Sequence, residues 1–303
     1  MTALAPVAVN LLGLVEHPWL GDNPYRVDGD GRPYVPAGDG GIVLGLNLGD
    51  SVFAADADHA APGACLTHHD EAARHALVLY ACIGNEVRVA TGAAAGAVGT
   101  VVGKRGEQGR VITAFTQADL ARLRPGDQVS VRACGQGYRP SWLPPTVTVL
   151  NADPVLLGRL PVSARQDRPA VEVRVRAVLP ARLAGNGIGR PAAGWDLDLQ
   201  VDPGHQAGAD LRLGDLVAIT DIDARWNMGY RRDWMTVGVV VHGASPLPGH
   251  GPGITVILTG PVSALRPMPD AASHTGLTAL MLNQRLPVVG TPLKQRKGAG
   301  SHS

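Results

Sequence analysis

The sequence predicts a mainly β protein built from several small barrel-like or sandwich-like modules, with Gly/Pro-rich connections and one or two short helices. The 39 glycines and 24 prolines lie between apolar runs instead of forming one tract, which indicates many turns. The runs that they bound are rich in Val and Ile, which favour strands. Only 4% of the residues are aromatic, so the predicted core is aliphatic.

One phrase, Leu-x-x-Gly-Asp-x-Val, occurs three times, as Leu46-Asn-Leu-Gly-Asp-Ser-Val52, Leu123-Arg-Pro-Gly-Asp-Gln-Val129 and Leu211-Arg-Leu-Gly-Asp-Leu-Val217. Gly supplies the positive φ of a tight turn, and the Asp side chain caps that turn before a strand begins. Such a turn is common in any small barrel. The phrase therefore indicates three similar strand entries, and not a particular function.

Strand candidates follow at short spacing along the chain. In order they are 7–15, 41–48, 77–81, 87–90, 99–102, 110–115, 128–133, 147–150, 170–178, 196–201, 216–221, 236–241 and 254–258. Residues 116–123 predict a short helix, because Thr116 suits the N-cap position and Asp119 follows three residues later. Residues 273–285 predict a second helix, with Leu277, Leu280 and Met281 on one face.

The length of 303 residues allows two domains. Residues 139–145, Arg-Pro-Ser-Trp-Leu-Pro-Pro, predict a linker because proline cannot enter a central strand. We therefore expect N-terminal β modules over 1–140 and C-terminal β modules over 146–290. The basic Gly/Ser-containing end predicts a disordered tail over 291–303.

Charge and apolar patterning disfavour several classes of function. Lys and Arg number 27 against 26 Asp and Glu, and a net charge of +1 gives no field that would gather nucleic acid or anionic lipid. No stretch is apolar enough for a membrane span, and the N-terminus lacks signal-peptide features, so we predict a cytoplasmic protein. Cys65, Cys82 and Cys134 are odd in number and widely spaced, which predicts free thiols.

The first candidate site is the polar segment after residue 54. Asp58 and His59 are adjacent there, and an Asp beside a His can orient or charge the imidazole. His69 and His75 lie too far apart for the His-Glu-x-x-His motif of metallopeptidases. For the part from 68 to 75, a solvated loop is the preferred interpretation.

The second candidate is the preferred catalytic neighbourhood. Cys82, Asn85 and Glu86 leave a predicted strand at a Gly turn, and Lys104 with Arg105 adds cations nearby. Cys82 is the candidate nucleophile. The alternative is that Cys82 is a buried small hydrophobe and that Asn85 and Glu86 only cap a turn.

The third candidate is a metal site. Asp221 and Asp223 alternate at a strand end and so point to one side, where His242 and His250 are further candidate ligands of a divalent metal ion. A calcium loop would need Asp or Asn at 225 and Gly at 226, where this chain has Arg225 and Trp226. The alternative for His250 is an exposed side chain on a hairpin turn.

Two glycine-rich stretches fail to complete a nucleotide motif. Residues 99–104 are one residue short of a Walker A loop, and Arg105 stands where Ser or Thr should hold magnesium. Arg190 stands where the dinucleotide fingerprint of 185–190 needs Gly. Neither stretch predicts a nucleotide site.

Six motifs occur in one order: Ala57-Asp-His-Ala-Ala-Pro-Gly63, Ala81-Cys-Ile-Gly-Asn-Glu86, Gly99 to Gly106, Gly185-Asn-Gly-Ile-Gly189, Gly214-Asp-Leu-Val-Ala-Ile-Thr-Asp221, and Val239-Val-Val-His-Gly243 with Gly249-His-Gly-Pro-Gly253. Together they resemble domain-of-unknown-function family 4438, over nearly the whole chain up to about Leu265. The resemblance implies a mainly β, multi-module, homo-oligomeric protein without an established activity. Arg105 departs from the pattern, which has His after Lys104, so an activity that needs that His would not extend to this chain.

The broad β organisation also resembles acetamidase and formamidase proteins, which are metal-assisted hydrolases of small amides. No catalytic residue carries over from that looser likeness.

Two functions remain open from the sequence. The first is an enzyme acting on a small polar molecule by hydrolysis of an amide or cyclic amide, or by related isomerase or lyase chemistry. Cys82 or a metal-bound water would be the nucleophile, and Glu86 or His59 would carry the proton. The second is a non-catalytic small-molecule-binding or assembly scaffold protein. The first predicts one pocket shared by these residues: Asp58, His59, Cys82, Glu86, and His242 or His250.

Overall fold

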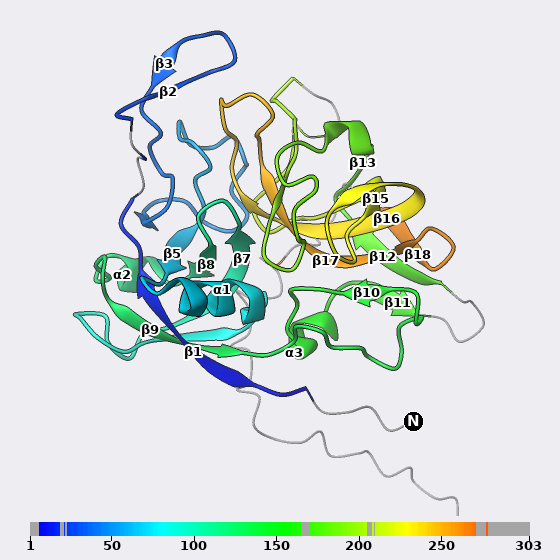
Figure 1. Cartoon of the computed structure of the whole chain (residues 1–303), viewed down its shortest axis with the longest axis horizontal. Coiled ribbons are helices and arrows are strands. Elements are labelled where there is room, and N and C mark those ends of the chain that lie inside the picture. Colours follow the sequence, from blue (N-terminus) through cyan, green and yellow to red (C-terminus); the bar gives the residue numbers. More distant parts are fainter. Residues whose placement is uncertain are drawn as a thin grey trace, which may run out of the picture.

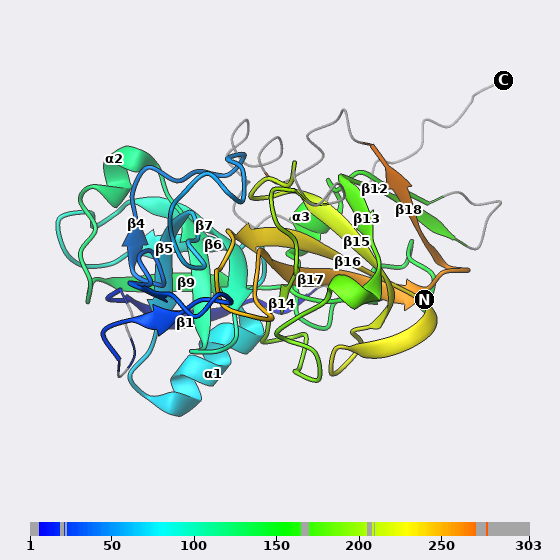
Figure 2. The same ribbon diagram turned by 90° about the horizontal axis from the view of Figure 1, so that it is seen from above.

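The computed structural model describes residues 6–18, 21, 23–164, 170–204, 208, 210–270 and 277, and it is mainly β, as predicted (Figure 1). Within this part of the chain, eighteen strands accompany three short α-helices and one 3₁₀ turn. The barrel and a second sheet lie side by side in Figure 2.

Six strands of the N-terminal half close into an antiparallel barrel, because the first strand of the series pairs with both the second and the last. Around the barrel they are β1 (Val9–Val15), β9 (Gln128–Ala133), β6 (Glu86–Val89), β7 (Val98–Arg105), β8 (Arg110–Ala114) and β5 (Gly63–Thr67). The short β4 (Ile42–Val43) extends the sheet beyond β5. Aliphatic side chains such as Leu66, Val101 and Val129 fill the interior.

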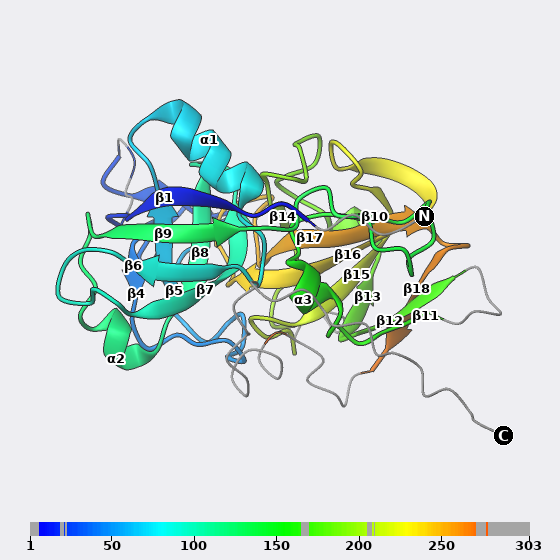
Figure 3. The ribbon, with the colours of Figure 1, turned by 90° about the horizontal axis from the view of Figure 1, so that it is seen from below.

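Helix α1 (Glu71–Tyr80) packs against β1 and β8 (Figure 3). The strand predicted over 77–81 is wrong, because these residues form the last turn of α1 and the residue after it. Asp70 caps the helix by accepting a hydrogen bond of 2.8 Å from the Ala73 amide, and Leu77 and Val78 face the barrel core. A short apolar run fits a buried helix face as well as a strand.

The C-terminal half forms a second sheet, in the order β10 (Thr148–Val149), β17 (Gly253–Pro261), β16 (Gly229–His242), β15 (Leu216–Asp223) and β13 (Ala177–Leu179), with β14 (Leu197–Asp198) also paired to β17. A smaller sheet contains β11 (Val162–Ala164), β12 (Val171–Val175) and β18 (Leu265–Pro269). The remaining elements are the hairpin β2 (Arg26–Val27) and β3 (Pro33–Tyr34), helices α2 (Gln117–Leu120) and α3 (Pro154–Leu157), and the turn η1 (Ala181–Leu183).

The two halves share one hydrophobic core. The largest cluster joins barrel residues such as Ile112 to Val237 and Val239 of the second sheet. The predicted linker over 139–145 does lie between β9 and β10, but the modules on either side of it pack against each other. They approach each other closely at Gly103 in β7, where a Cβ atom would lie 2.5 Å from the Cβ of Val241 in β16.

All three copies of the repeated phrase form the predicted turn. Gly49, Gly126 and Gly214 have φ values of 95°, 90° and 92°. In each copy the following Asp carboxylate accepts a hydrogen bond from the amide three residues earlier, at 2.8–2.9 Å. The second and third copies lead into β9 and β15, whereas the first ends in a bridge between Ser51 and Arg212 of the third copy.

The structure can also be compared with the predicted helices, tail, free thiols and lack of a membrane span. The capped helix predicted at 116–123 is α2, with Thr116 as its N-cap. Apart from Leu277, the helix predicted over 273–285 lies outside the described residues, as does the tail over 291–303. The three cysteines are free thiols and are buried. None of the described helices is long and apolar enough to cross a membrane.

Replacing Gly103 tests the contact between barrel and sheet. We expect Gly103→Ala to lower the free energy of unfolding by about 1–3 kcal/mol, because the added methyl group overlaps Val241. Gly229→Ala is the matched control, since this strand glycine has no neighbour nearer than 3.9 Å, and its effect should stay within about 0.5 kcal/mol. Urea unfolding measures both, and equal effects would contradict the close approach.

Candidate metal centre

Three side chains from distant parts of the chain bring ligand atoms together between the barrel and the second sheet. His59 comes from the loop between β4 and β5, Asp198 from β14, and His250 from the loop between β16 and β17. His59 Nε2 lies 3.0 Å from His250 Nδ1 and 3.6 Å from Asp198 Oδ2. His250 Nδ1 lies 2.9 Å from the same Asp198 oxygen. These three atoms form a small triangle of potential ligands.

Strand register places two further groups beside this triangle. Asp198 in β14 pairs with Gly253 in β17, and Gly253 pairs with His242 in β16. Gly253 has no side chain, and the imidazole of His242 fills the space that a side chain at 253 would take. A Cβ atom built on Gly253 would lie 1.9 Å from His242 Nε2. His242 Nε2 thus lies 3.4 Å from Asp198 Oδ1 and 2.9 Å from Asp196 Oδ2.

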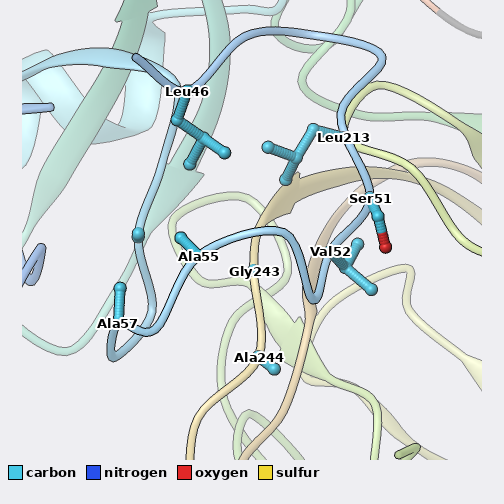
Figure 4. A pocket seen from close by; sticks show the side chains of 9 residues that line it. Leu46, Ser51, Val52, Ala55, Ala57, Leu213, Gly243 and Ala244 are labelled. Atoms are coloured by element: carbon cyan, nitrogen blue, oxygen red, sulfur yellow. The ribbon is translucent and has the colours of Figure 1, made fainter. Parts of the chain in front are cut away.

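The loop that carries His59 is fastened to the end of β16. The His59 amide donates to the Ala244 carbonyl at 3.0 Å, and the Gly243 amide donates to the Ala60 carbonyl at 2.9 Å. His59 has a φ of 53°, a conformation that is uncommon for a residue with a side chain and that often occurs at functional sites. Figure 4 shows the small pocket beside this loop, lined mainly by short apolar side chains such as Ala55 and Ala57. That pocket offers few polar groups to a ligand.

Asp58 holds the other side of the His59 ring. Its Oδ1 lies 2.5 Å from His59 Nδ1, and its Oδ2 accepts hydrogen bonds from Arg26 at 2.6 Å and from the Tyr34 hydroxyl at 2.9 Å. Burial by itself would raise the pKa of Asp58, but the His59 and Tyr34 contacts hold this pKa well below its usual range. A carboxylate on Nδ1 leaves Nε2 as the ligand atom, which is the usual outer-shell arrangement for a metal-binding His.

Asp39 is the centre of a buried ion-pair network. Its Oδ1 accepts from Arg105 and, at 2.7 Å, from Arg110, while its Oδ2 accepts from Arg26 at 2.8 Å. Burial opposes ionisation of Asp39, but the Arg105 and Arg110 guanidiniums keep its pKa below the usual value. Since Arg26 also binds Asp58, Asp39 is linked to the His59 side of the cluster.

The network also reaches His250. Arg105 Nη2 lies 2.9 Å from Glu107 Oε2, and Glu107 Oε1 lies 3.8 Å from His250 Nδ1. Asn186 donates to the same Glu107 oxygen at 2.7 Å. Glu107 lies on the hairpin between β7 and β8 of the barrel, whereas His250 belongs to the loop between β16 and β17. A barrel residue therefore lies beside a His from the second sheet.

The cluster carries an excess of negative groups. Among its described members, six carboxylates face three guanidiniums: Glu16, Asp39, Asp58, Glu107, Asp196 and Asp198 against Arg26, Arg105 and Arg110. Burial lowers the pKa of His242, but Asp196 and Asp198 outweigh it and raise this pKa to about 10. Asp198 likewise raises the pKa of His250. The site therefore attracts positive charge, as protons or as metal cations.

The spacing fits a metal ion. Ligand atoms about 2.0–2.2 Å from one ion lie roughly 3.0–3.5 Å from one another, close to the spacings seen here. Asp198 Oδ2 is buried, and it accepts no hydrogen bond of normal geometry from the described residues. A buried carboxylate oxygen that lacks such a bond and faces two imidazole nitrogens is costly without a partner, and a cation between the three atoms would compensate it.

Four of the sequence-predicted residues meet in this cluster: Asp58, His59, His242 and His250. Cys82 and Asn85 do not reach it. Burial raises the pKa of the Cys82 thiol to about 12, which opposes the thiolate that a nucleophile requires. Asn85 instead accepts from the Cys82 amide and donates to the Cys134 carbonyl, so it ties buried backbone together.

Lys104 and Glu86 also lie elsewhere. The Lys104 ammonium is buried and donates to the Leu79 carbonyl, to Asn151 Oδ1 and to the Ala193 carbonyl, at 3.2, 2.7 and 2.7 Å. Burial lowers the pKa of Lys104 to about 8, and three acceptors still suit the protonated amine. Glu86 pairs with Arg88 at the surface.

Asp221 and Asp223 are not brought to His242 and His250. The strand is irregular between Thr220 and Ile222, and Asp221 has a φ of 59° and accepts from the Asp233 amide. Asp223 is paired with Arg225 and Arg231, which compensate its charge without a metal.

The prediction from sequence missed Asp196, Asp198, Glu107 and Asp39. A signal for the first pair was present, because Asp196 and Asp198 alternate with Leu197 and therefore put two acids on one face of an otherwise apolar strand.

A cleft of about 570 Å³ borders the cluster, between α1, the β7–β8 hairpin and the segment around Trp195; its lining includes Arg74, His75, Glu107 and Gln108. The side chains of Glu107 and His250 are 24% and 18% exposed, whereas His59, Asp198 and His242 are almost fully buried. A ligand would therefore approach the cluster past Glu107.

Comparison with known proteins identifies relatives without an assigned activity. The model described as Domain of unknown function (DUF4438), N-terminal, matches residues 25–158, and its C-terminal counterpart matches residues 159–277. A solved structure titled "Crystal structure of TM1086" is 35% identical, with a TM-score of 0.85 over 89% of this chain and 95% of that chain. No curated protein matches. The looser likeness to acetamidase and formamidase proteins gains no support from these matches.

Removing the central carboxylate tests the ion-pair network. We expect Asp39→Asn to lower the free energy of unfolding by about 3–5 kcal/mol, because buried guanidiniums lose their shared counter-charge. Asp30→Asn is the control, since Asp30 pairs with Arg32 at the surface and should cost only about 0–1 kcal/mol. Urea unfolding compares them. Similar losses for the two variants would contradict a central role for Asp39.

Proposed function

We propose that this chain, which belongs to the DUF4438 family, is a metal-dependent hydrolase of small amides or cyclic amides. The observation that carries the proposal is the convergence of His59 Nε2, His250 Nδ1 and Asp198 Oδ2 within 3.6 Å of one another. Two imidazoles and one carboxylate are a ligand set used by Zn²⁺, Fe²⁺ and Mn²⁺.

The donor set supports catalysis as well as binding. Three protein ligands leave a coordination position open, as in catalytic zinc sites. A divalent cation there would lower the pKa of a bound water and polarise a substrate carbonyl. Glu107 borders both the cleft and His250, which supports our assignment to it of the proton transfer between that water and the substrate.

The proposed reaction balances with water as the only co-reactant. The water oxygen bonds to the carbonyl carbon, the carbon–nitrogen bond breaks, and Glu107 passes the proton taken from water to the leaving nitrogen. Trp195 and Arg74 line the cleft and offer an apolar wall and a cation to the rest of the substrate. These contacts suit a small molecule with both planar and anionic parts.

A cysteine-dependent reaction has less support. Cys82 is buried, its thiol lies 3.6 Å from the Tyr80 carbonyl and 3.8 Å from Gln136, and its pKa is raised to about 12 by burial. A nucleophilic thiol instead needs a lowered pKa and an adjacent base. The alternative of a non-catalytic metal-containing binding protein differs from the proposal only in lacking turnover.

Removal of a ligand should remove the metal. We expect His59→Ala and His250→Ala each to weaken Zn²⁺ binding by more than about 100-fold, since even outer-shell partners are worth about 10–100-fold. His69→Ala replaces an exposed His and should bind Zn²⁺ as the wild type does. Metal analysis after dialysis against Zn²⁺ buffers measures affinity, and release of amine from a panel of amides measures turnover. A wild-type protein that binds no cation would overturn the proposal, and a metal-bound protein that hydrolyses no amide would favour the binding protein.

The outer-shell carboxylate gives a finer test. Asp58→Asn keeps every proposed ligand but weakens the hold on His59 Nδ1, so Zn²⁺ affinity should fall by about 10–100-fold. Asp56→Asn alters an exposed acid two residues earlier and should leave affinity unchanged. An unchanged Zn²⁺ affinity in Asp58→Asn would show that Asp58 does not orient a ligand.

A further inference from the structure

We infer that the same cluster holds a second divalent cation between Asp196, Asp198 and His242, so that the Asp198 carboxylate bridges two metal ions. The inference rests on the proposed function and extends it from a one-metal to a two-metal centre. It starts from the observation that the two oxygens of Asp198 face different donors. Oδ2 lies near His59 and His250, whereas Oδ1 lies 3.4 Å from His242 Nε2.

The second donor set has the spacing of a first coordination shell. His242 Nε2 lies 2.9 Å from Asp196 Oδ2 and 3.4 Å from Asp198 Oδ1. The three side chains are at most 4% exposed, so water does not compensate the two carboxylates. Two carboxylate oxygens and one imidazole nitrogen suit Mn²⁺, Fe²⁺ or Zn²⁺.

The remaining side-chain polar atoms of Asp196 and His242 already have partners. Asp196 Oδ1 accepts a hydrogen bond of 2.9 Å from the Gly106 amide, and His242 Nδ1 lies 2.9 Å from the Gly243 carbonyl. When Nδ1 donates to that carbonyl, Nε2 presents its lone pair to Asp196 and Asp198. His242 Nε2, Asp196 Oδ2 and Asp198 Oδ1 therefore point toward one another, and the outer partners of Asp196 and His242 fix the orientation of these two side chains.

The backbone keeps that point open. Gly253 lies between Asp198 and His242 in the sheet, and any side chain at 253 would overlap His242 Nε2. A protonated His242 paired with the two carboxylates is the competing arrangement, and it needs no second ion. The two arrangements differ in how many cations one chain binds.

A bridging carboxylate would give the centre the chemistry of two-metal hydrolases. The ions of such centres lie about 3.5–4 Å apart, and in amide hydrolysis they would share the activation of water and the polarisation of the carbonyl. In this chain the ion at His59 and His250 would face Glu107 and the cleft, because these are the more exposed groups. The ion at His242 would lie deeper and stabilise charge on the substrate carbonyl oxygen.

The test is the number of ions that each chain binds. Full-length protein is stripped with a chelator, loaded with Zn²⁺ or Mn²⁺, and analysed for metal content and, with Mn²⁺, by electron paramagnetic resonance. We expect two ions per wild-type chain and a spectrum of spin-coupled Mn²⁺. Asp196→Asn should bind one ion and give a spectrum of isolated Mn²⁺. Asp202→Asn, which alters an exposed acid nearby in sequence, should keep both ions.

Gly253→Ala is a second variant that removes no ligand. Its methyl group displaces His242 Nε2, so it too should reduce the content to one ion, while Gly229→Ala should keep two. One ion in the wild type, or two uncoupled ions that survive Asp196→Asn, would overturn the bridged centre but leave the proposed hydrolase standing. No ion in the wild type would overturn both.

Discussion

Three guanidinium groups share the buried carboxylate of Asp39, and the rest of the candidate site depends on this arrangement. Each guanidinium also binds a second carboxylate: Arg26 binds Asp58, Arg105 binds Glu107, and Arg110 binds Glu16. Asp58 in turn holds His59, and Glu107 lies beside His250. Buried ion pairs of this kind contribute little net stability, because desolvation offsets their attraction. Their value here is positional, since they hold Asp58 against His59 and Glu107 beside His250.

The geometry of the cluster requires both halves of the chain. The barrel contributes His59, Glu107 and the Gly106 amide, and the second sheet contributes Asp196, Asp198, His242 and His250. The close approach of Gly103 to Val241 brings the β7–β8 hairpin next to the end of β16, where His242 lies. An isolated half would hold an incomplete set of ligands. The shared core is thus a condition for the site as well as for stability.

Local structure could be predicted from the sequence, whereas the pairing of strands distant in the sequence could not. The Gly-Asp turns, the strand at 128–133 and the cap at Thr116 follow from short-range rules and are confirmed. The helix over 71–80 was missed because its apolar end also suits a strand. Asp58, His59, His242 and His250 were each recognised as candidates, but their meeting depends on strand register.

The two Asp-x-Asp pairs show that a local sequence pattern does not tell which charged partners the fold brings to an acid. Asp221 and Asp223 were predicted as metal ligands and Asp196 and Asp198 were not considered, although in both pairs one apolar residue separates the two acids in the sequence. Arg225 and Arg231 follow the first pair in the sequence and neutralise Asp223, whereas the second pair contacts imidazoles and a backbone amide. An acidic pair that contacts imidazoles instead of guanidiniums is therefore the better metal candidate, because its charge still needs a partner.

Arg105 stands at a position where the resemblance to the family implies His, and its contacts explain how Arg serves there. A guanidinium has five donors on a planar fork and can serve two carboxylates at once, whereas a His has two ring nitrogens and loses its charge near neutral pH. Arg105 uses this capacity to join Asp39 to Glu107. It takes no place among the proposed ligands, so the departure changes the support of the site and leaves its ligand set intact. A reaction carried by His59, His250 and Asp198 is therefore compatible with Arg at this position.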